Sequence, residues 1–198
     1  MQIDYFEGGA MEVPGSREII PVVNQLISHF ELVYAAIDWH PANHISFAGN
    51  YPWRHIGQIL TIDGRDQELL PFHCVKDSFG AKFFPGLNME GITEVIHKGT
   101  QSGLDDHSCF FDADFKTETG LHQELLENKV QRLFIAGLST DGGVKKSVLD
   151  GLKLGFEVFF VEDACKALNK TRGSGNKAQK EMEEAGAVCV PSNRLIEL

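Results

Sequence analysis

Short apolar runs alternate with helical patterns along most of this chain, and this alternation limits the folds available to it. Strands are predicted at residues 32–37 (LVYAAI), 93–97, 131–138 (QRLFIAGL), 156–161 (FEVFFV) and 187–190. Helices are predicted at residues 16–30, 121–128, 140–154 and 176–185. Strand–helix–strand alternation predicts an α/β fold with a mostly parallel sheet and helices on both faces. The polar residues 39–92 are rich in turn formers, and at most one short helix is predicted there.

Composition and charge are those of a globular protein without a nucleic-acid or membrane partner. The 198 residues fit one domain, residues 1–198, and show no internal repeat or linker. A net charge of −10 disfavours nucleic acid and anionic membranes as partners. No apolar run approaches the roughly 18 residues that span a bilayer. No signal-peptide pattern opens the chain, and its four cysteines are scattered. We therefore expect reduced thiols and a cytoplasmic location.

Three segments follow predicted strands or lie between them, which is where parallel α/β sheets bind their ligands. Asp38 and His40 come directly after the first strand, and two residues of spacing in an extended segment place both side chains on one side. His73 comes from a separate loop. One carboxylate and two imidazoles are a common ligand set for zinc, iron or manganese. Residues 137–144 (GLSTDGGV) form a strand-to-helix turn whose backbone N–H groups suit a carbonyl oxygen or an anion.

Each of these features has a simpler explanation, and spacing alone leaves the alternatives open. An Asp-x-His pair occurs by chance, and paired glycines such as Gly142 and Gly143 commonly mark a tight turn. Cys74 beside His73 reads as a small buried hydrophobe. His44 and His107 could support a ligand or lie at the surface. The remaining histidines lie in no such cluster and are interpreted as structural or solvated: His29, His55, His97 and His122.

Six ordered motifs resemble one family over nearly the whole chain. They read DWHPANHISFA, LLPFHCV, HKG, SCFFDAD, GLSTDGGVKKSVLDGLKLGFEV and VEDACKAL, and the opening QIDYFEGGAMEVPG is similar to the family's first loop. The resemblance is to nicotinamidases of the isochorismatase-like hydrolases. It implies a three-layer fold with a six-stranded parallel sheet. It also implies hydrolysis of nicotinamide to nicotinate and ammonia through a cysteine acyl-enzyme, and with it a role in NAD salvage.

The resemblance assigns roles to several residues. Asp38, His40 and His73 match the ligands of one divalent metal ion, with zinc expected first and iron or manganese as alternatives. Lys98 matches a lysine that lowers the pKa of the nucleophilic thiol. Ser139 and Gly143 match the positions whose backbone N–H groups form the oxyanion hole, with a cis peptide between Leu138 and Ser139. Family members often form homo-oligomers, but the sequence predicts no number of copies.

The departures from the family pattern bear directly on activity. The nucleophile lies in a T-D-x-C-V motif, which here reads TDGGV, so Gly143 occupies the cysteine position. The catalytic aspartate would immediately precede Met1, at the end of a central first strand that we expect to be truncated. Leu70 stands at a tryptophan position and His107 at a tyrosine position of the substrate pocket, while Tyr5 keeps its aromatic character.

Three interpretations follow. The chain is a nicotinamidase-type hydrolase whose catalysis is impaired as written, a metal-binding pseudoenzyme for a small carboxamide or carboxylate, or a hydrolase that uses a metal-bound hydroxide on another amide or ester. Cys74 and Cys109 are the candidate replacement thiols, and we regard substitution by either as a weak hypothesis. Replacement of Gly143 by cysteine, with an upstream strand restored, would discriminate among these interpretations.

Overall fold

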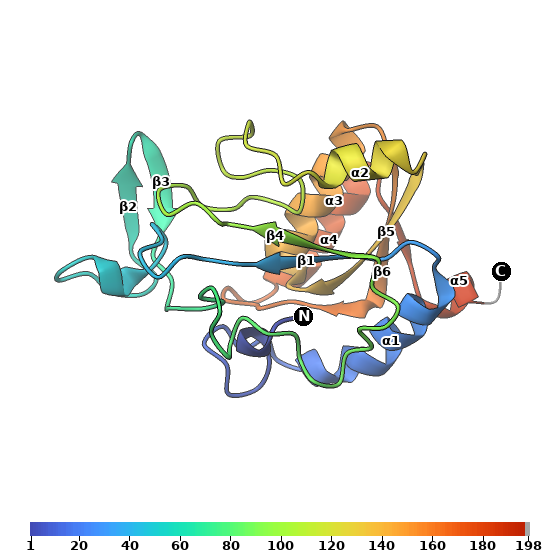
Figure 1. Ribbon diagram of the computed structural model, residues 1–198, viewed down its shortest axis with the longest axis horizontal. Coiled ribbons are helices and arrows are strands. Elements are labelled where there is room, and N and C mark those ends of the chain that lie inside the picture. Colours follow the sequence, from blue (N-terminus) through green and yellow to red (C-terminus); the bar gives the residue numbers. More distant parts are fainter. Residues whose placement is uncertain (197–198) are drawn as a thin grey trace.

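Five parallel strands form the centre of the structure, and they fall into two groups (Figure 1). In this computed structural model, which describes residues 1–196, β1 (Tyr34–Asp38) pairs with β4 (Glu94–Lys98). The second group has the order β5 (Arg132–Leu138), β6 (Glu157–Lys166) and β7 (Val188–Val190). All pairings within the two groups are parallel, which confirms the predicted α/β class.

The sheet is interrupted between β1 and β5. Within residues 1–196, β1 pairs with β4 alone and β5 pairs with β6 alone. The resemblance implied six strands in one sheet, and that number is wrong for the described residues, which contain five parallel strands in two sheets.

Helices cover both faces of the strands. On one face lies α1 (Ile20–His29), preceded by a 3₁₀ turn, η2 (Ser16–Ile19), together with α5 (Asn193–Ile196). The other face carries α2 (Leu121–Glu127), α3 (Lys145–Lys153) and α4 (Ser174–Glu184). The apolar residues of α1 recur three or four positions apart and are buried, so this helix is stabilised mainly by packing. None of the helices described over residues 1–196 is long and apolar enough to cross a membrane.

Two predicted elements differ in extent from those observed. The helix predicted at 140–154 is divided into a π-helical turn, η4 (Thr140–Val144), and α3, because Gly142 has the non-helical angles φ −119° and ψ −122°. Strand β6 continues past its predicted end at residue 161. There Glu162 and Asp163 are exposed, while Ala164 and Cys165 are buried, so the apolar run is interrupted although the strand is not.

Residues 39–92 contain a β-hairpin that the sequence analysis did not predict. Strands β2 (Ile59–Ile62) and β3 (Arg65–Glu68) pair antiparallel and project away from the sheet (Figure 1). Their turn is Asp63-Gly64, and both residues have positive φ, 50° and 77°. An Asp-Gly turn is a strong hairpin signal that could have identified these strands. A 3₁₀ turn, η3 (Ala48–Asn50), lies in the same segment, and a further one, η1 (Ile3–Tyr5), lies near the amino end.

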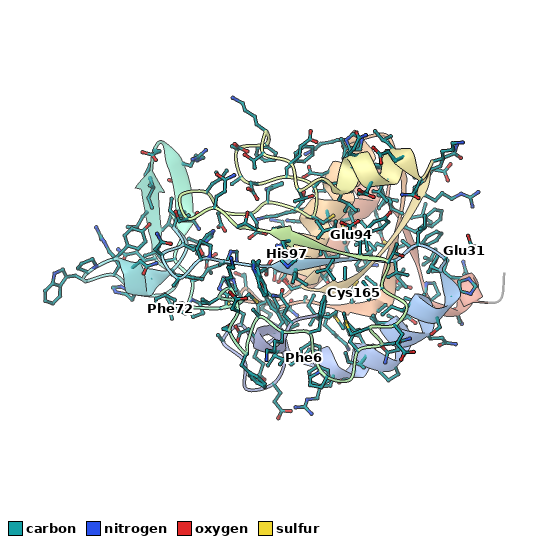
Figure 2. All side chains as sticks on the ribbon, in the orientation of Figure 1. Phe6, Glu31, Phe72, Glu94, His97 and Cys165 are labelled. Atoms are coloured by element: carbon teal, nitrogen blue, oxygen red, sulfur yellow. The ribbon has the colours of Figure 1, made fainter. Side chains whose placement is uncertain are left out.

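Phe72, which Figure 2 labels, lies in the segment after β3. Its ring packs on that of Phe47, with 4.9 Å between the ring centroids.

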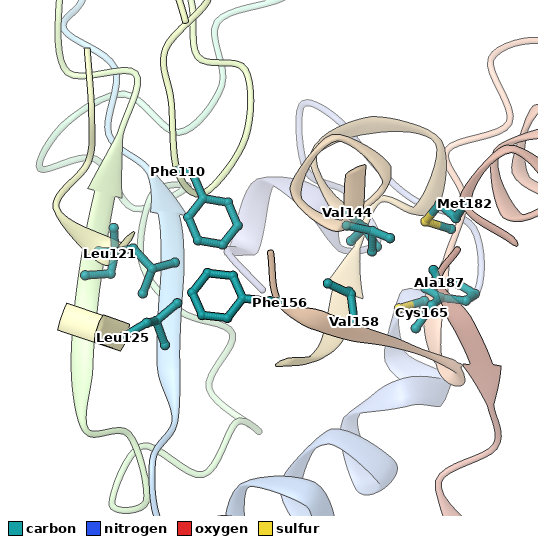
Figure 3. Packing of buried hydrophobic residues seen from close by; sticks show 12 residues of the cluster. Phe110, Leu121, Leu125, Val144, Phe156, Val158, Cys165, Met182 and Ala187 are labelled. Atoms are coloured by element: carbon teal, nitrogen blue, oxygen red, sulfur yellow. The ribbon is translucent and has the colours of Figure 1, made fainter. Parts of the chain in front are cut away.

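Replacing Met182 with alanine is expected to lower the free energy of unfolding by about 2–5 kcal/mol, the usual cost of truncating a fully buried side chain. Met182 is 0% exposed and packs in the cluster that joins α4 to β6 (Figure 3). Urea unfolding monitored by circular dichroism measures the change. Met89, which is 39% exposed, provides a matched control, and Met89→Ala should shift the free energy by less than about 0.5 kcal/mol. Equal unfolding midpoints for the two variants would contradict the packing described for α4.

Candidate metal centre

Asp38, His40 and His73 meet at the carboxyl end of β1. One potential ligand atom from each residue lies within 4.8 Å of the other two. Asp38 is the last residue of β1, and His40 forms a parallel bridge with Val75, which brings the chain at residues 73–75 beside it. The three side chains are buried, being 4%, 1% and 4% exposed. Residues from two distant segments thus form one cluster of ligand atoms.

The two imidazoles are oriented as metal ligands. His40 Nδ1 lies 2.9 Å from the carbonyl oxygen of Gly99, and His73 Nδ1 lies 2.9 Å from that of Pro71. A carbonyl only accepts, so each Nδ1 carries the proton and donates it, which leaves Nε2 with a free lone pair. This arrangement is usual for histidines that bind a metal through Nε2. The donor set of one carboxylate and two imidazoles therefore fits a divalent ion such as zinc.

The carboxylate of Asp38 is engaged from both sides. Lys98 Nζ forms an ion pair with one oxygen, and the Tyr5 hydroxyl donates to the other. Burial alone would raise the pKa of Asp38, but the positive charge of Lys98 holds it well below its usual range. Burial in turn raises the pKa of Tyr5. Asp38 is thus ionised at neutral pH, as a metal ligand must be.

Asp106 is a residue of this site that sequence reasoning missed. Its carboxylate forms an ion pair with Lys98, and one oxygen lies 4.0 Å from His40 Nε2. Although burial opposes the charge of Lys98, Asp106 and Asp38 raise the pKa of its amine. Lys98 is therefore a fixed cation and not a proton acceptor. The adjacent carboxylates of Asp105 and Asp106 were the signal available in the sequence. Their separation from Lys98 along the chain gave no reason to expect a contact.

The turn after β5 presents Gly143 to open space. The peptide between Leu138 and Ser139 is cis, as the resemblance implied. An added Cβ at Gly143 would meet no heavy atom within 4 Å, and the φ of this residue lies outside the left-handed region. At Gly142 the same atom would lie 2.6 Å from Ser139 Oγ. A side chain is therefore sterically allowed at Gly143 and obstructed one residue earlier.

A cavity of about 1210 Å³ brings the predicted site residues together. Its wall includes Lys98 and the turn residues Ser139 and Gly143. The predicted substrate-pocket residues also line it, namely Tyr5, Leu70 and His107, together with the metal-ligand candidates Asp38 and His73. His40 does not line this cavity. A volume of this size accommodates a small aromatic amide.

The cysteines near the cavity are not activated. Cys74 is fully buried, and burial raises the pKa of its thiol far above the ordinary value. Cys109 lines the cavity, and burial raises the pKa of its thiol to about 11. Thiolate is the reactive form, so neither group is a nucleophile at neutral pH. These pKa shifts weigh against the hypothesis that either cysteine replaces the missing one.

His44 supports the cluster without facing it. It is 0% exposed, with Nδ1 2.8 Å from Ser46 Oγ and Nε2 3.2 Å from the carbonyl oxygen of Leu104. Its ring lies 4.2 Å from that of His40 between centroids. Burial lowers the pKa of His44 to about 4, so the ring is neutral. Both nitrogens are engaged, which makes this histidine a packing partner of His40.

Asp141 connects the turn at η4 to the loop before α4. Its carboxylate accepts hydrogen bonds from the backbone N–H groups of Leu168 and Asn169 and from Ser174 Oγ. Partial burial would raise the pKa of Asp141, but the bond from Ser174 and the two N–H groups hold it below the ordinary value.

Asp141→Asn is expected to lower the free energy of unfolding by about 1–3 kcal/mol at pH 7. The folded-state pKa is depressed, so this stabilisation is present above the unfolded pKa near 3.9. It is lost as the pH falls through the folded value. The difference between variant and parent should therefore shrink below about pH 4. Thermal unfolding from pH 3 to pH 8 measures it, with the exposed Asp77→Asn as control. A pH-independent difference would contradict the argument from charge.

Fold and site together define an α/β protein with a candidate metal centre at the carboxyl edge of its parallel strands. The family model described as "Isochorismatase domain" matches residues 1–193, and the chain belongs to the isochorismatase family.

Known proteins similar to this chain carry related names. The nicotinamidase of Escherichia coli (strain K12) is 39% identical over 194 residues, covering 94% of this chain and 89% of that protein. A solved nicotinamidase/pyrazinamidase of Acinetobacter baumannii has a TM-score of 0.93 at 37% identity, covering 98% and 93% of the two chains. A structure from L. infantum in complex with nicotinate has a TM-score of 0.84 at 30% identity, covering 98% of this chain and 89% of that chain. The Pyrococcus horikoshii pyrazinamidase in complex with zinc has a TM-score of 0.77 at 33% identity, covering 96% and 94%.

Proposed function

We propose that this chain is a nicotinamidase-like amide hydrolase by descent, folded as one domain over residues 1–198. We further propose that it holds one zinc ion at Asp38, His40 and His73 and takes nicotinamide in the adjoining cavity. The observation that carries the proposal is the buried Asp/His/His cluster beside a cavity that also contains Lys98 and the Ser139–Gly143 turn. Similar proteins named nicotinamidases, and one solved with zinc, support both the substrate class and the ion.

Different residues around the cavity would contact different parts of the bound amide. A zinc ion here would act as a Lewis acid and would hold a ring nitrogen or a water. Lys98 supplies a permanent positive charge, and the backbone N–H groups of the turn after β5 are suited to the carboxamide oxygen. Tyr5, Leu70 and His107 form an aromatic and apolar wall for a pyridine ring.

We infer that cysteine-dependent hydrolysis is impaired in this chain. Gly143 has no side chain to attack the amide carbon, and the nearby thiols of Cys74 and Cys109 have raised pKa values. Lys98 remains protonated and cannot take a proton from water or a thiol. The site retains what is needed to bind the ion and the amide, but it lacks the group that would form the acyl-enzyme.

The test combines three measurements on one purified sample: metal content by elemental analysis, nicotinamide binding by calorimetry, and ammonia release from nicotinamide. We expect about one zinc ion per chain, measurable binding, and little ammonia. Ammonia release that resists thiol alkylation but stops on chelation would show metal-dependent hydrolysis and would overturn the inferred impairment. The metal assignment fails if no ion is found, and iron or manganese in its place would correct the identity of the ion.

A further inference from the structure

The loop between β4 and α2 carries His107 on the wall of the cavity. This loop is attached to α3, because the backbone N–H of Cys109 donates to Ser147 Oγ at 2.9 Å. Within the loop, the backbone N–H of His107 donates to the carbonyl oxygen of Phe111 at 3.0 Å. The ring of His107 packs on that of Phe115, with 4.4 Å between the ring centroids. The imidazole is therefore held in one place on the cavity wall.

Asp150 of α3 has a buried carboxylate oxygen that lacks a hydrogen-bond partner. The side chain is 2% exposed, and its Oδ1 accepts from Lys153 Nζ at 2.9 Å. Oδ2 accepts no hydrogen bond from any group in residues 1–196, and His107 Nε2 lies 3.6 Å away from it. A shift of about half an ångström brings these two atoms to hydrogen-bond distance. Because a buried oxygen without a partner is costly, we interpret His107 and Asp150 as a dyad in which Nε2–H donates to Oδ2.

The charges around His107 keep its ring neutral. Burial and the positive charge of Lys146 lower the pKa of His107, and Lys153 acts in the same direction. The carboxylates of Asp150 and Asp106 oppose this shift without reversing it. A neutral imidazole has one N–H and one lone pair, and a carboxylate can only accept. The proton therefore lies on Nε2, which leaves the lone pair on Nδ1.

The lone pair of His107 Nδ1 is available to a ligand in the cavity. Within residues 1–196 no hydrogen bond involves this atom, since the ring nitrogens that form hydrogen bonds belong to three other histidines. Asp150, the partner of His107, lies five residues after the start of α3, which is about 8 Å along the helix axis. The turn at Ser139 and Gly143 precedes that start and lines the same cavity. A pyridine carboxamide with its amide group at the turn can therefore bring a distant ring substituent to His107.

We propose that His107, held in one tautomer by Asp150, is a specificity-determining residue that accepts a hydrogen bond from an amino or hydroxyl group on the ring of the bound amide. The preferred ligand is then a pyridine carboxamide with a hydrogen-bond donor on a ring carbon distant from the amide. Asp150 does not line the cavity, so it is a positioning residue that acts through the imidazole. This inference rests on the proposed function, because it names the substituent that the same cavity selects.

The first test compares ligands that differ in the donor and not in shape. Calorimetry with the zinc-loaded parent measures the affinities of 5-aminonicotinamide and 6-aminonicotinamide, and of the two corresponding methyl compounds. At the ring position that faces His107, the amino compound should bind about 5- to 10-fold more tightly than the methyl compound, the usual effect of one hydrogen bond. His107→Phe keeps an aromatic ring without the acceptor, and it should abolish this preference.

The second test reverses the hydrogen-bonding state of the ring. In Asp150→Asn, Lys153 still donates to the side-chain oxygen, which turns the NH₂ group toward His107 Nε2. An NH₂ group donates, so the imidazole proton should move to Nδ1, and methoxynicotinamide should replace aminonicotinamide as the tighter ligand. The ¹⁵N chemical shifts of the ring report the tautomer without any ligand, and the signal missing from His107→Phe assigns them. Lys153→Ala removes the exposed partner of the same carboxylate, and both the tautomer and the preference should stay as in the parent.

The outcomes separate this proposal from the proposed function. A donor preference that persists in His107→Phe, or a parent ring that carries its proton on Nδ1, overturns the proposal. If Asp150→Asn does not fold, the tautomer of the parent and the affinities of His107→Phe decide it alone. If the folded, zinc-loaded parent binds none of these amides, the proposed function fails and the ligand preference fails with it. The tautomers of the parent and of Asp150→Asn then still show whether Asp150 sets the state of the ring.

Discussion

Replacing Gly143 with cysteine is expected to raise the rate of ammonia release from nicotinamide by about 10²- to 10³-fold. The new Cβ meets no heavy atom within 4 Å and the backbone needs no left-handed φ, so the thiol enters the cavity without strain. Gly143 lies two residues before Lys145, the first residue of α3, and the amino end of a helix lowers the pKa of a nearby thiol. Loss of a nucleophile from an intact triad costs about 10⁶-fold, so returning the nucleophile alone recovers only part of that rate.

Two variants separate chemistry from packing in this experiment. Gly143→Ala adds the same Cβ without the thiol and should leave the rate at the level of the parent chain. Gly142→Cys places a thiol one residue earlier, where its Cβ would lie 2.6 Å from Ser139 Oγ and would displace that hydroxyl, and it should not react. Iodoacetamide should abolish the gained activity. A folded cysteine variant that is alkylated normally yet is no faster than Gly143→Ala would show that the position is misassigned or that changes at Leu70 and His107 exclude the substrate.

His73→Ala is expected to weaken zinc binding by more than about 100-fold. Altering only the hydrogen-bond partner of a ligating histidine lowers affinity by about 10–100-fold, and removing the ligand itself costs more. A zinc ion that binds only the folded state raises the free energy of unfolding by about 2.7 kcal/mol when the free zinc concentration is 100 times the dissociation constant. Chelation should therefore lower the Tm of the parent chain and leave that of His73→Ala unchanged.

The matched control is His55→Ala, which removes an exposed histidine outside the cluster. Its zinc affinity, measured by competition with a chromophoric chelator, should equal that of the parent. Circular dichroism at one fixed temperature checks that both variants are folded. Equal zinc affinities for His73→Ala and the parent would remove His73 from the ligand set and with it the proposed metal centre.

Periodicity and order along the chain were sufficient to predict the parallel strands and α1 to α4, but not the short α5. Apolar runs such as 131–138 have few alternatives in a chain of alternating elements, and β5 covers nearly the same residues. Asp38 and His40 could be placed together because a spacing of two in an extended segment fixes their direction. His73 entered the ligand set with support from the resemblance, and the structure brings it within 4.8 Å of the others.

The rest depended on contacts that no local pattern encodes. Asp106 joins the site only because the loop after β4 returns to Lys98. The Tyr5 hydroxyl reaches Asp38 across 33 positions of sequence. The state of Cys109 follows from burial, which depends on how the whole chain packs. By contrast, the hairpin at β2 and β3 had a local signal in Asp63-Gly64, and its omission was an error of pattern reading.

The opening residues have a practical consequence for producing this protein. Gln2 is bonded to the peptide of Asp38, and Asp4 accepts the N–H of Cys74, beside His73, at 2.7 Å. The first residues of the chain therefore contact both segments that carry the candidate metal ligands. An oligohistidine tag fused there would itself bind the ion close to the ligand residues, so metal stoichiometry from such a preparation would report on the tag. Purification through a tag placed after α5 keeps the measurement on the protein's own ligands.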